Sequence, residues 1–318
     1  MSFSSLLLYI LSLAVLVAAW GFVLNLVKKF RLHFLSLYMG YLVAINIAGL
    51  LNLVVSDLAS EVLRDISPQG MQTVYALFGL VAFPLLAIAF YFFLAFIAGI
   101  LDESISPPLR TAYVILWIVL FAAFLIRIQL ALKQKNPGIS QILNLVSGAV
   151  IILLPIIALI YLMLRTGCGS RNREGKGLTT FGVISLASHV LFLAAFSFSQ
   201  AGSSLRWAVP FCLFLANLAP VLALRKVLSR YGRPILPEAF ADPRMQRFRS
   251  RFQLSAREAE VLDLLLKGKS NKDIEGDLFI SHHTVRNHVH NIYQKLDVSS
   301  RLQLMHLVRT WFESGSSS

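Results

Sequence analysis

The fold is decided near the C-terminal end by a segment that reads LSAREAEVLDLLLKGKSNKDIEGDLFISHHTVRNHVHNIYQKLDVSSRLQLMHLVRTWF, residues 254–312. A serine precedes each of four short stretches with helical apolar spacing, and serine side chains cap helix N-termini. These serines are Ser255, Ser270, Ser281 and Ser300. The apolar positions expected in the second helix are Ile274, Leu278 and Phe279. Ser255 with Glu258 forms a capping-box pattern and Gly268 is a common helix end, so the segment predicts a domain of four short helices.

The third of these helices indicates what the domain does. At 100° per residue, its apolar residues fall within about 40° of one another and predict a stripe that faces the core. These residues are Val285, Val289, Ile292 and Leu296. The opposite side carries His283, Asn287, His290 and Gln294, flanked by Arg286 and Asn291. Because no carboxylate occurs between Ser281 and Lys295, this donor-rich surface favours the major groove of DNA over a plain solvated face.

The segment resembles the LuxR/GerE-type helix-turn-helix domain of bacterial transcription regulators. Four motifs carry the resemblance: L-S-x-R-E-x-E-V-L at Leu254–Leu262, S-N-K-D-I at Ser270–Ile274, I-S-x-x-T-V-R-x-H-V at Ile280–Val289 and N-I-x-x-K-L at Asn291–Leu296. Gly268 and the pair Ser300-Arg301 also fit the family pattern. The resemblance covers nearly the whole domain and does not reach residues 1–224.

The resemblance implies that the third helix enters the major groove, with Arg286, Asn287 and His290 at the base-reading positions. The full set of DNA-binding residues expected is His283, Thr284, Arg286, Asn287, His290, Asn291, Gln294 and Lys295. The fourth helix is expected to join two copies of the chain on DNA through Leu304, Leu307, Val308 and Trp311. Two departures from the family matter. Glu275, followed by Gly276, stands where a small residue is usual, and His290 stands where a basic side chain is common, so an unusual target sequence is expected. A glycine inside a helix costs roughly 1 kcal/mol, so the second helix is expected to be weaker than usual.

The histidines of the third helix raise the question of a metal site. His283 and His290 share a face but lie roughly 10 Å apart along a helix, which is too far for one ion. The two cysteines, Cys168 and Cys212, are distant from each other and from these histidines. We therefore expect no metal site. The apolar runs contain no close pair of carboxylates and no His/Glu motif, so no other cofactor and no enzymatic activity are expected either.

The composition of the whole chain indicates a membrane protein. Hydrophobic residues make up 57% of the 318 residues and charged residues only 14%, unlike a soluble domain of this length. Seven apolar runs are long enough to cross a bilayer, which takes about 20 residues. They are approximately Phe3–Val27, Phe34–Val55, Met71–Leu101, Leu109–Leu132, Gln141–Leu164, Leu178–Gln200 and Trp207–Leu224. The first run lacks the basic start of a signal peptide, so we expect it to be a retained helix.

Loop charges predict the orientation in the membrane, because basic loops stay in the cytoplasm. The first loop holds Lys28, Lys29 and Arg31, and the fifth holds Arg165, Arg171, Arg173 and Lys176. The second loop is mainly acidic. Seven spans with this orientation place the C-terminal domain in the cytoplasm of a bacterium, anchored to the inner membrane.

The net charge of +13 is concentrated outside the helix-turn-helix domain. Residues 225–251 hold eight basic residues against Glu238 and Asp242, whereas residues 252–313 are balanced. Pro234, Pro237 and Pro243 should prevent a long helix between 225 and 251, so this part is expected to be a linker. Its arginines suit either anionic lipid or the DNA backbone.

Three polar residues within the apolar runs are candidates for sensing a signal. Arg127 suits an anionic ligand or an interfacial position, and His189 suits a sensing role or a packing role. Asn217 precedes Pro220 by one turn, and Pro210 and Pro220 together predict two bends in the last apolar helix. Such a bend could transmit a signal or serve packing alone.

Together these features predict an all-α protein, with a seven-helix transmembrane bundle followed by a cytoplasmic four-helix LuxR-type domain. The expected division is a sensor domain at 1–224, a linker at 225–251, the DNA-binding domain at 252–313 and a disordered tail at 314–318. The expected function is a one-component transcription regulator that responds to an unknown small-molecule or membrane signal. Its expected partners are double-stranded DNA, membrane lipid and a second copy. The alternative is a transporter-like membrane protein whose DNA-binding domain reports transport.

Overall fold

The computed structural model describes residues 3–30, 32–57, 67–101, 103, 105–133, 137–167, 173–200, 208–231, 242–298 and 300–314. All secondary structure in these ranges is helical, as predicted. Several features discussed above fall outside them: Arg31, Arg171, Cys168, the acids between 58 and 66, the prolines at 234 and 237, and residues 315–318.

Seven long helices precede the C-terminal domain and agree with the seven predicted apolar runs. They are α1 (Phe3–Phe30), α2 (His33–Asp57), α3 (Pro68–Ile100), α4 (Pro107–Leu132), α5 (Pro137–Gly167), α6 (Arg173–Gln200) and α7 (Ala208–Tyr231). Helices α3, α4 and α5 each begin at a proline, whose missing N–H would have no intrahelical partner at that position. Ser67 strengthens the start of α3, since its hydroxyl accepts a hydrogen bond from the Gly70 N–H at 3.2 Å.

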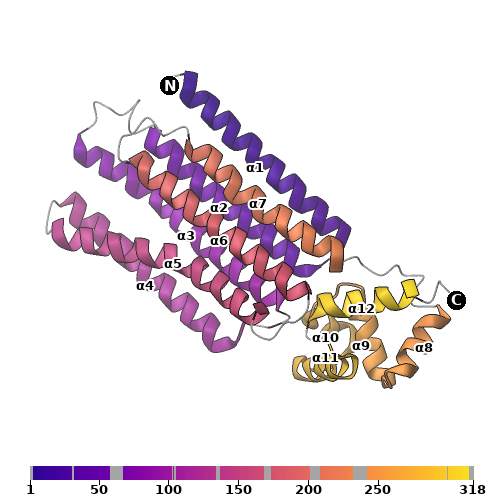
Figure 1. Cartoon of the computed structure of the whole chain (residues 1–318). Helices are drawn as coiled ribbons and strands as arrows, with labels where there is room; N and C mark the ends of the chain where they lie inside the picture. Colours follow the sequence, from indigo (N-terminus) through magenta and orange to yellow (C-terminus); the bar gives the residue numbers. More distant parts are fainter. Residues whose placement is uncertain are drawn as a thin grey trace.

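Neighbouring helices of the bundle pack side by side, and the last of them closes it by lying against both α1 and α6 (Figure 1). Helix α3 contacts α2, α4 and α5, and α5 contacts α3, α4 and α6. Aromatic side chains fill two regions of the interior. Tyr38, Tyr41, Phe93, Phe96 and Phe181 lie where α2, α3 and α6 meet, and Phe83, Phe90, Trp117 and Phe124 join α3 to α4.

The outer surface of the bundle is apolar. Helix α4 buries Trp117, Leu120 and Phe124, yet it leaves Ile118 and Val119 exposed between them. In the described residues, four stretches are long and apolar enough to cross a membrane: His33–Leu51, Ala76–Ile100, Pro107–Leu132 and Gly138–Thr166. Four spans are therefore compatible with a membrane domain, and the count of seven stays a prediction.

The N-terminus and the C-terminal domain lie at opposite ends of the bundle (Figure 1). At the end that carries the C-terminal domain, Arg165 of α5 donates to Glu103 of the α3–α4 loop at 2.6 Å. Tyr161 donates to the other carboxylate oxygen at 3.0 Å. These bonds tie the α3–α4 loop to the C-terminal end of α5.

The expected linker contains more helix than its prolines suggested. Helix α7 continues to Tyr231, and Pro243 begins a further helix, α8 (Pro243–Arg251). Asp242 caps α8, because its carboxylate accepts a hydrogen bond from the Arg244 N–H at 2.7 Å. Pro243 thus starts a helix instead of preventing one, as prolines do at the first helical position.

The two prolines of α7 stand at different positions in the helix. Pro220 lies inside α7, where its ring opens the hydrogen-bond ladder. Pro210 lies in the first turn of α7, where no intrahelical N–H bond exists to be lost. The second predicted bend therefore has no physical basis at Pro210.

Four helices complete the chain in the predicted order: α9 (Ala256–Leu266), α10 (Asn271–Leu278), α11 (His282–Leu296) and α12 (Arg301–Ser314). The capping box of Ser255 and Glu258 is confirmed, and Ser270 with Asp273 forms a second one. Gly268 ends α9 with a φ of 88°, a left-handed conformation that glycine adopts without strain.

Candidate nucleic-acid interface

Helix α11 is built by its cap and by its apolar stripe. The Ser281 hydroxyl accepts the Thr284 N–H at 3.1 Å and is also hydrogen-bonded to the Thr284 hydroxyl at 2.8 Å. The predicted core stripe is confirmed, since its four members are buried: Val285, Val289, Ile292 and Leu296. Helix α9 packs against this stripe and α10 lies beside it.

The side of α11 opposite its stripe is exposed along its whole length. The exposed residues that were predicted to bind DNA are His283, Arg286, Asn287, His290, Asn291, Gln294 and Lys295. Thr284 is half-buried and engaged with the cap. The face offers guanidinium, amide and imidazole groups and no carboxylate, which is the chemistry that reads base edges and holds phosphates.

Lys295 has a structural contact that its predicted DNA role did not include. Its ammonium group donates to Glu258 at 2.6 Å and to the Gln253 carbonyl at 2.9 Å. These bonds fasten the C-terminal end of α11 to the start of α9. Burial raises the pKa of Glu258, but the hydrogen bonds from Lys295 and Ser255 outweigh it, so the pKa lies below its ordinary value.

The turn between α10 and α11 sets the position of α11. Arg257 of α9 donates to the Leu278 carbonyl at 2.8 Å and so satisfies the end of α10. Ile274 is buried and Leu278 half-buried, as predicted for apolar positions of this helix. Phe279 is not: it takes a left-handed conformation with φ 52° and is 94% exposed.

A second arginine holds the other connection of the motif. Arg301 is buried at the start of α12 and donates to the Leu265 carbonyl at 2.8 Å and to the Lys269 carbonyl. It therefore satisfies backbone groups at the end of α9 and in the loop that leads to α10. The Ser300-Arg301 pair belonged to the family pattern, but its capping role was not predicted, because the partners lie far away in sequence.

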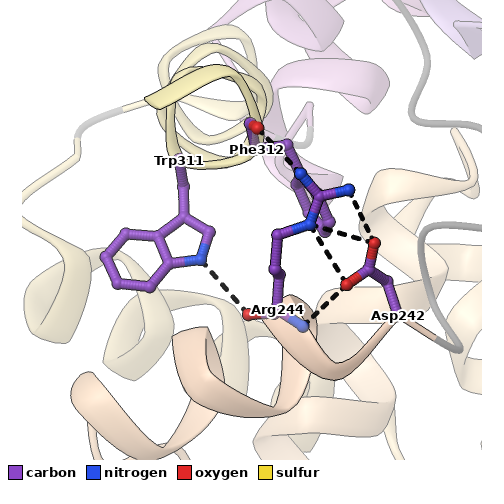
Figure 2. Close-up of polar contacts among 4 residues, drawn as sticks. All are labelled: Asp242, Arg244, Trp311 and Phe312. Carbon is purple, nitrogen blue, oxygen red and sulfur yellow. Dashed lines mark hydrogen bonds and ion pairs between the residues drawn. The ribbon is translucent and has the colours of Figure 1, made fainter. Parts of the chain in front are cut away.

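Helix α8 is fastened to the end of α12, as Figure 2 shows. Arg244 donates to the Phe312 carbonyl at 3.1 Å, and Trp311 donates to the Arg244 carbonyl at 3.2 Å. Asp242 accepts from the same guanidinium at 2.8 Å, and these bonds hold the pKa of Asp242 below its ordinary value. Met245 and Phe248 are buried on the inner face of α8. Residues 242–251 are therefore packed onto the DNA-binding domain and are not a free linker.

The expected dimer contact on α12 needs a correction. Leu304 and Val308 are fully buried inside the chain, so these side chains cannot form a surface contact in this conformation. Trp311 packs on Phe248 and Phe252, with ring centroids 5.6 and 6.3 Å away. Leu307 is half-buried, and α12 also contacts α7. The apolar side of α12 is thus covered within the chain.

The candidate sensing residues do not form one group. His189 of α6 meets Tyr41 of α2, with 2.9 Å between the Tyr41 hydroxyl and Nε2, and its Nδ1 lies 2.7 Å from the Ser185 carbonyl. A proton on Nδ1 would donate to the carbonyl and leave Nε2 to accept from Tyr41, which satisfies the ring as a packing residue.

Asn217 of α7 is buried and exchanges two side-chain hydrogen bonds with Asn46 of α2, at 2.9 and 3.1 Å. Helix α2 therefore ties both α6 and α7. Arg127 lies elsewhere, on α4, where its guanidinium is 5.4 Å from the centre of the Phe124 ring.

Comparison with known proteins finds counterparts for the C-terminal domain. Residues 253–308 match the family model described as bacterial regulatory proteins, luxR family. The spore germination protein GerE of Bacillus subtilis is 50% identical over 56 residues, which are 18% of this chain and 76% of GerE. The transcriptional regulatory protein LiaR of Bacillus subtilis is 52% identical over 50 residues, 16% of this chain and 24% of LiaR.

The uncharacterized transcriptional regulatory protein YhcZ of Bacillus subtilis is 45% identical over 62 residues, 20% of this chain and 28% of YhcZ. No solved structure matches the chain. The family match begins after α8 and does not include the helices of the bundle.

Proposed function

Because the chain belongs to the luxR family of bacterial regulatory proteins through residues 253–308, we propose that it is a membrane-bound, one-component transcription regulator. It binds promoter DNA through α11 and receives its signal in the bundle of α1–α7. The observation that carries the first part is the exposed, carboxylate-free face of α11, held rigidly by the buried stripe behind it. Arg286, Asn287 and His290 read bases, while Thr284 and the start of α11 meet phosphates.

The apolar exterior of the bundle supports the second part. Exposed leucine, isoleucine and valine side chains on α4 and α5 would be costly in water and are favourable in lipid. In this proposal all seven long helices cross the inner membrane, with the C-terminal domain in the cytoplasm where DNA is found.

The route of the signal runs from α7 to α12. Helix α7 is covalently connected to α8, and α12 also packs directly against α7. Arg244 of α8 donates to the Phe312 carbonyl in the last turn of α12, so a shift of either contact would reposition α12. In this proposal the bend of α7 at Pro220 changes when the signal binds. Next to this bend, the Asn46–Asn217 hydrogen bonds hold α7 to α2. Two copies of the chain then change how they pair on DNA.

The test of DNA recognition uses the full chain in lipid nanodiscs. Preferred sites would first be selected from genomic fragments with the wild-type chain. The affinities of the wild-type chain and of an Arg286→Ala variant for these sites would then be compared. Loss of a base contact should cost about 1–3 kcal/mol at the preferred site and relax the preference at one base pair.

Arg247→Ala is the matched control, because Arg247 is also an exposed arginine but lies on α8. It should leave the preferred sequence unchanged. If the Arg286→Ala variant kept wild-type affinity and sequence preference, the assignment of α11 to the major groove would be wrong.

A further inference from the structure

Phe279 is an unusual surface residue. In the parts of the chain that the structure describes, the other exposed large apolar side chains lie within α1–α7, where lipid can cover them. Phe279 instead lies in the DNA-binding domain, between α10 and α11, with 94% of its surface exposed. A side chain of this size adds nothing to the core of the domain from such a position.

The backbone of Phe279 is strained as well. Its φ of 52° and ψ of 43° belong to the left-handed region, which bulky residues rarely adopt. In the described residues, positive φ also occurs at Gln253 after α8, at Gly268 after α9 and at Asp297 at the end of α11. Glycine and aspartate tolerate it, whereas phenylalanine makes the turn less stable than either would.

The turn also keeps the ring away from the core. Arg257 holds the carbonyl of Leu278, and the Phe279 N–H donates to the Glu275 carbonyl. On the other side, Ile280 packs against the core and Ser281 caps α11. With its backbone fixed on both sides, Phe279 stays at the surface, two positions before the cap of the helix that faces the groove.

We propose that the Phe279 ring contacts DNA at the edge of the major groove, where it packs on a deoxyribose and, where present, a thymine methyl group. The inference rests on the proposed function, since it adds Phe279 to the DNA-binding surface proposed for α11. The N-terminal end of a recognition helix is the end that approaches the bases, and the Phe279 turn adjoins this end. Sugars and thymine methyl groups are apolar parts of the groove wall, and a phenyl ring complements them.

The experiment compares the wild-type chain with Phe279→Asn and Phe279→Tyr in nanodiscs, on a preferred site. Asparagine tolerates the left-handed conformation but removes the ring, whereas tyrosine keeps it. We expect Phe279→Asn to bind DNA about fivefold to thirtyfold more weakly, as expected when a ring that DNA partly buries is removed. The slope of affinity against salt should stay the same, because no phosphate contact is lost. Phe279→Tyr should stay within about twofold of wild type.

Hydrogen exchange of the α10 and α11 amides gives the second readout. Relief of backbone strain should leave these amides equally or more protected in Phe279→Asn, so that weaker binding cannot be blamed on a damaged fold. Lower protection in this variant would overturn the proposal, because the ring would then be structural.

Wild-type affinity in Phe279→Asn would also overturn the proposal and leave the proposed function intact. The ring would then contact lipid or another protein instead of DNA. If the wild-type chain bound no DNA at all, the proposed function itself would fail.

Discussion

Replacement of Lys295 by methionine separates a structural lysine from a DNA-binding one. The side chain of Glu258 is 6% exposed, and it receives hydrogen bonds from Lys295 at 2.6 Å and from the Ser255 N–H at 2.8 Å. Without the lysine, a nearly buried carboxylate keeps only the bond from Ser255. Loss of one partner costs about 3–5 kcal/mol for a fully buried pair and about 0–1 kcal/mol for a surface pair.

This pair lies between those limits, because 37% of the Lys295 side chain is exposed and water screens the charge it leaves behind. We therefore expect Lys295→Met to destabilise the junction of α9 and α11 by about 1–2 kcal/mol. Hydrogen exchange of the full chain in nanodiscs should show protection factors in these helices that fall about tenfold.

Acidification should have the same effect as the mutation. The pKa of Glu258 is held below its ordinary value of 4.5, so its stabilising contribution is complete above that pH. The contribution disappears as the pH falls through the lowered pKa of the folded state. Protection of these amides, corrected for intrinsic exchange, should therefore be flat between about pH 6 and 8 and decrease below about pH 4.5 in the wild-type chain.

The double variant Glu258→Gln with Lys295→Met is the control. Its neutral amide still accepts from Ser255 and leaves no buried charge, so most of the lost protection should return. If Lys295→Met kept full protection and lowered the salt slope of DNA binding by about one per domain, Lys295 would be a phosphate contact and the structural argument would be refuted.

Three further results are expected. Gly276→Ala should stabilise α10 by about 0.5–1 kcal/mol, since a Cβ at this exposed position meets no atom within 4 Å; hydrogen exchange of α10 would show unchanged protection if the reasoning is wrong. Pro220→Ala should straighten α7 and lock a reporter gene on or off in a chain that inserts normally, whereas a normal response would remove this bend from the signal route. A periplasm-active reporter fused between residues 58 and 66 should be active and one fused between 168 and 172 silent; the reverse pattern would place α8–α12 outside the cell.

Local patterns account for what could be predicted. The serine caps, the stripe from Val285 to Leu296 and the apolar runs all express relations between residues within a few turns, and the structure confirms them as helices with these faces. Hydropathy also predicted the long helices before the C-terminal domain, since each apolar run corresponds to one helix of the bundle.

Relations between distant residues needed the tertiary structure. Lys295 stood on the exposed side of its helix, and only the approach of α9 showed that its ammonium group reaches Glu258. Periodicity identified an apolar side on α12, but it could not tell whether a second copy or the chain itself covers Leu304 and Val308.

By itself the sequence determined where helices begin and which of their faces are apolar, and it predicted which surface of the chain reads DNA. Those properties depend on caps, side-chain periodicity and composition, which are written in consecutive residues. The tertiary structure alone decided that α8 joins the DNA-binding domain, that Arg301 holds the end of α9 and that Phe279 stays outside the core. These depend on which helices meet and at what distance, and no local pattern encodes the partner of a buried side chain.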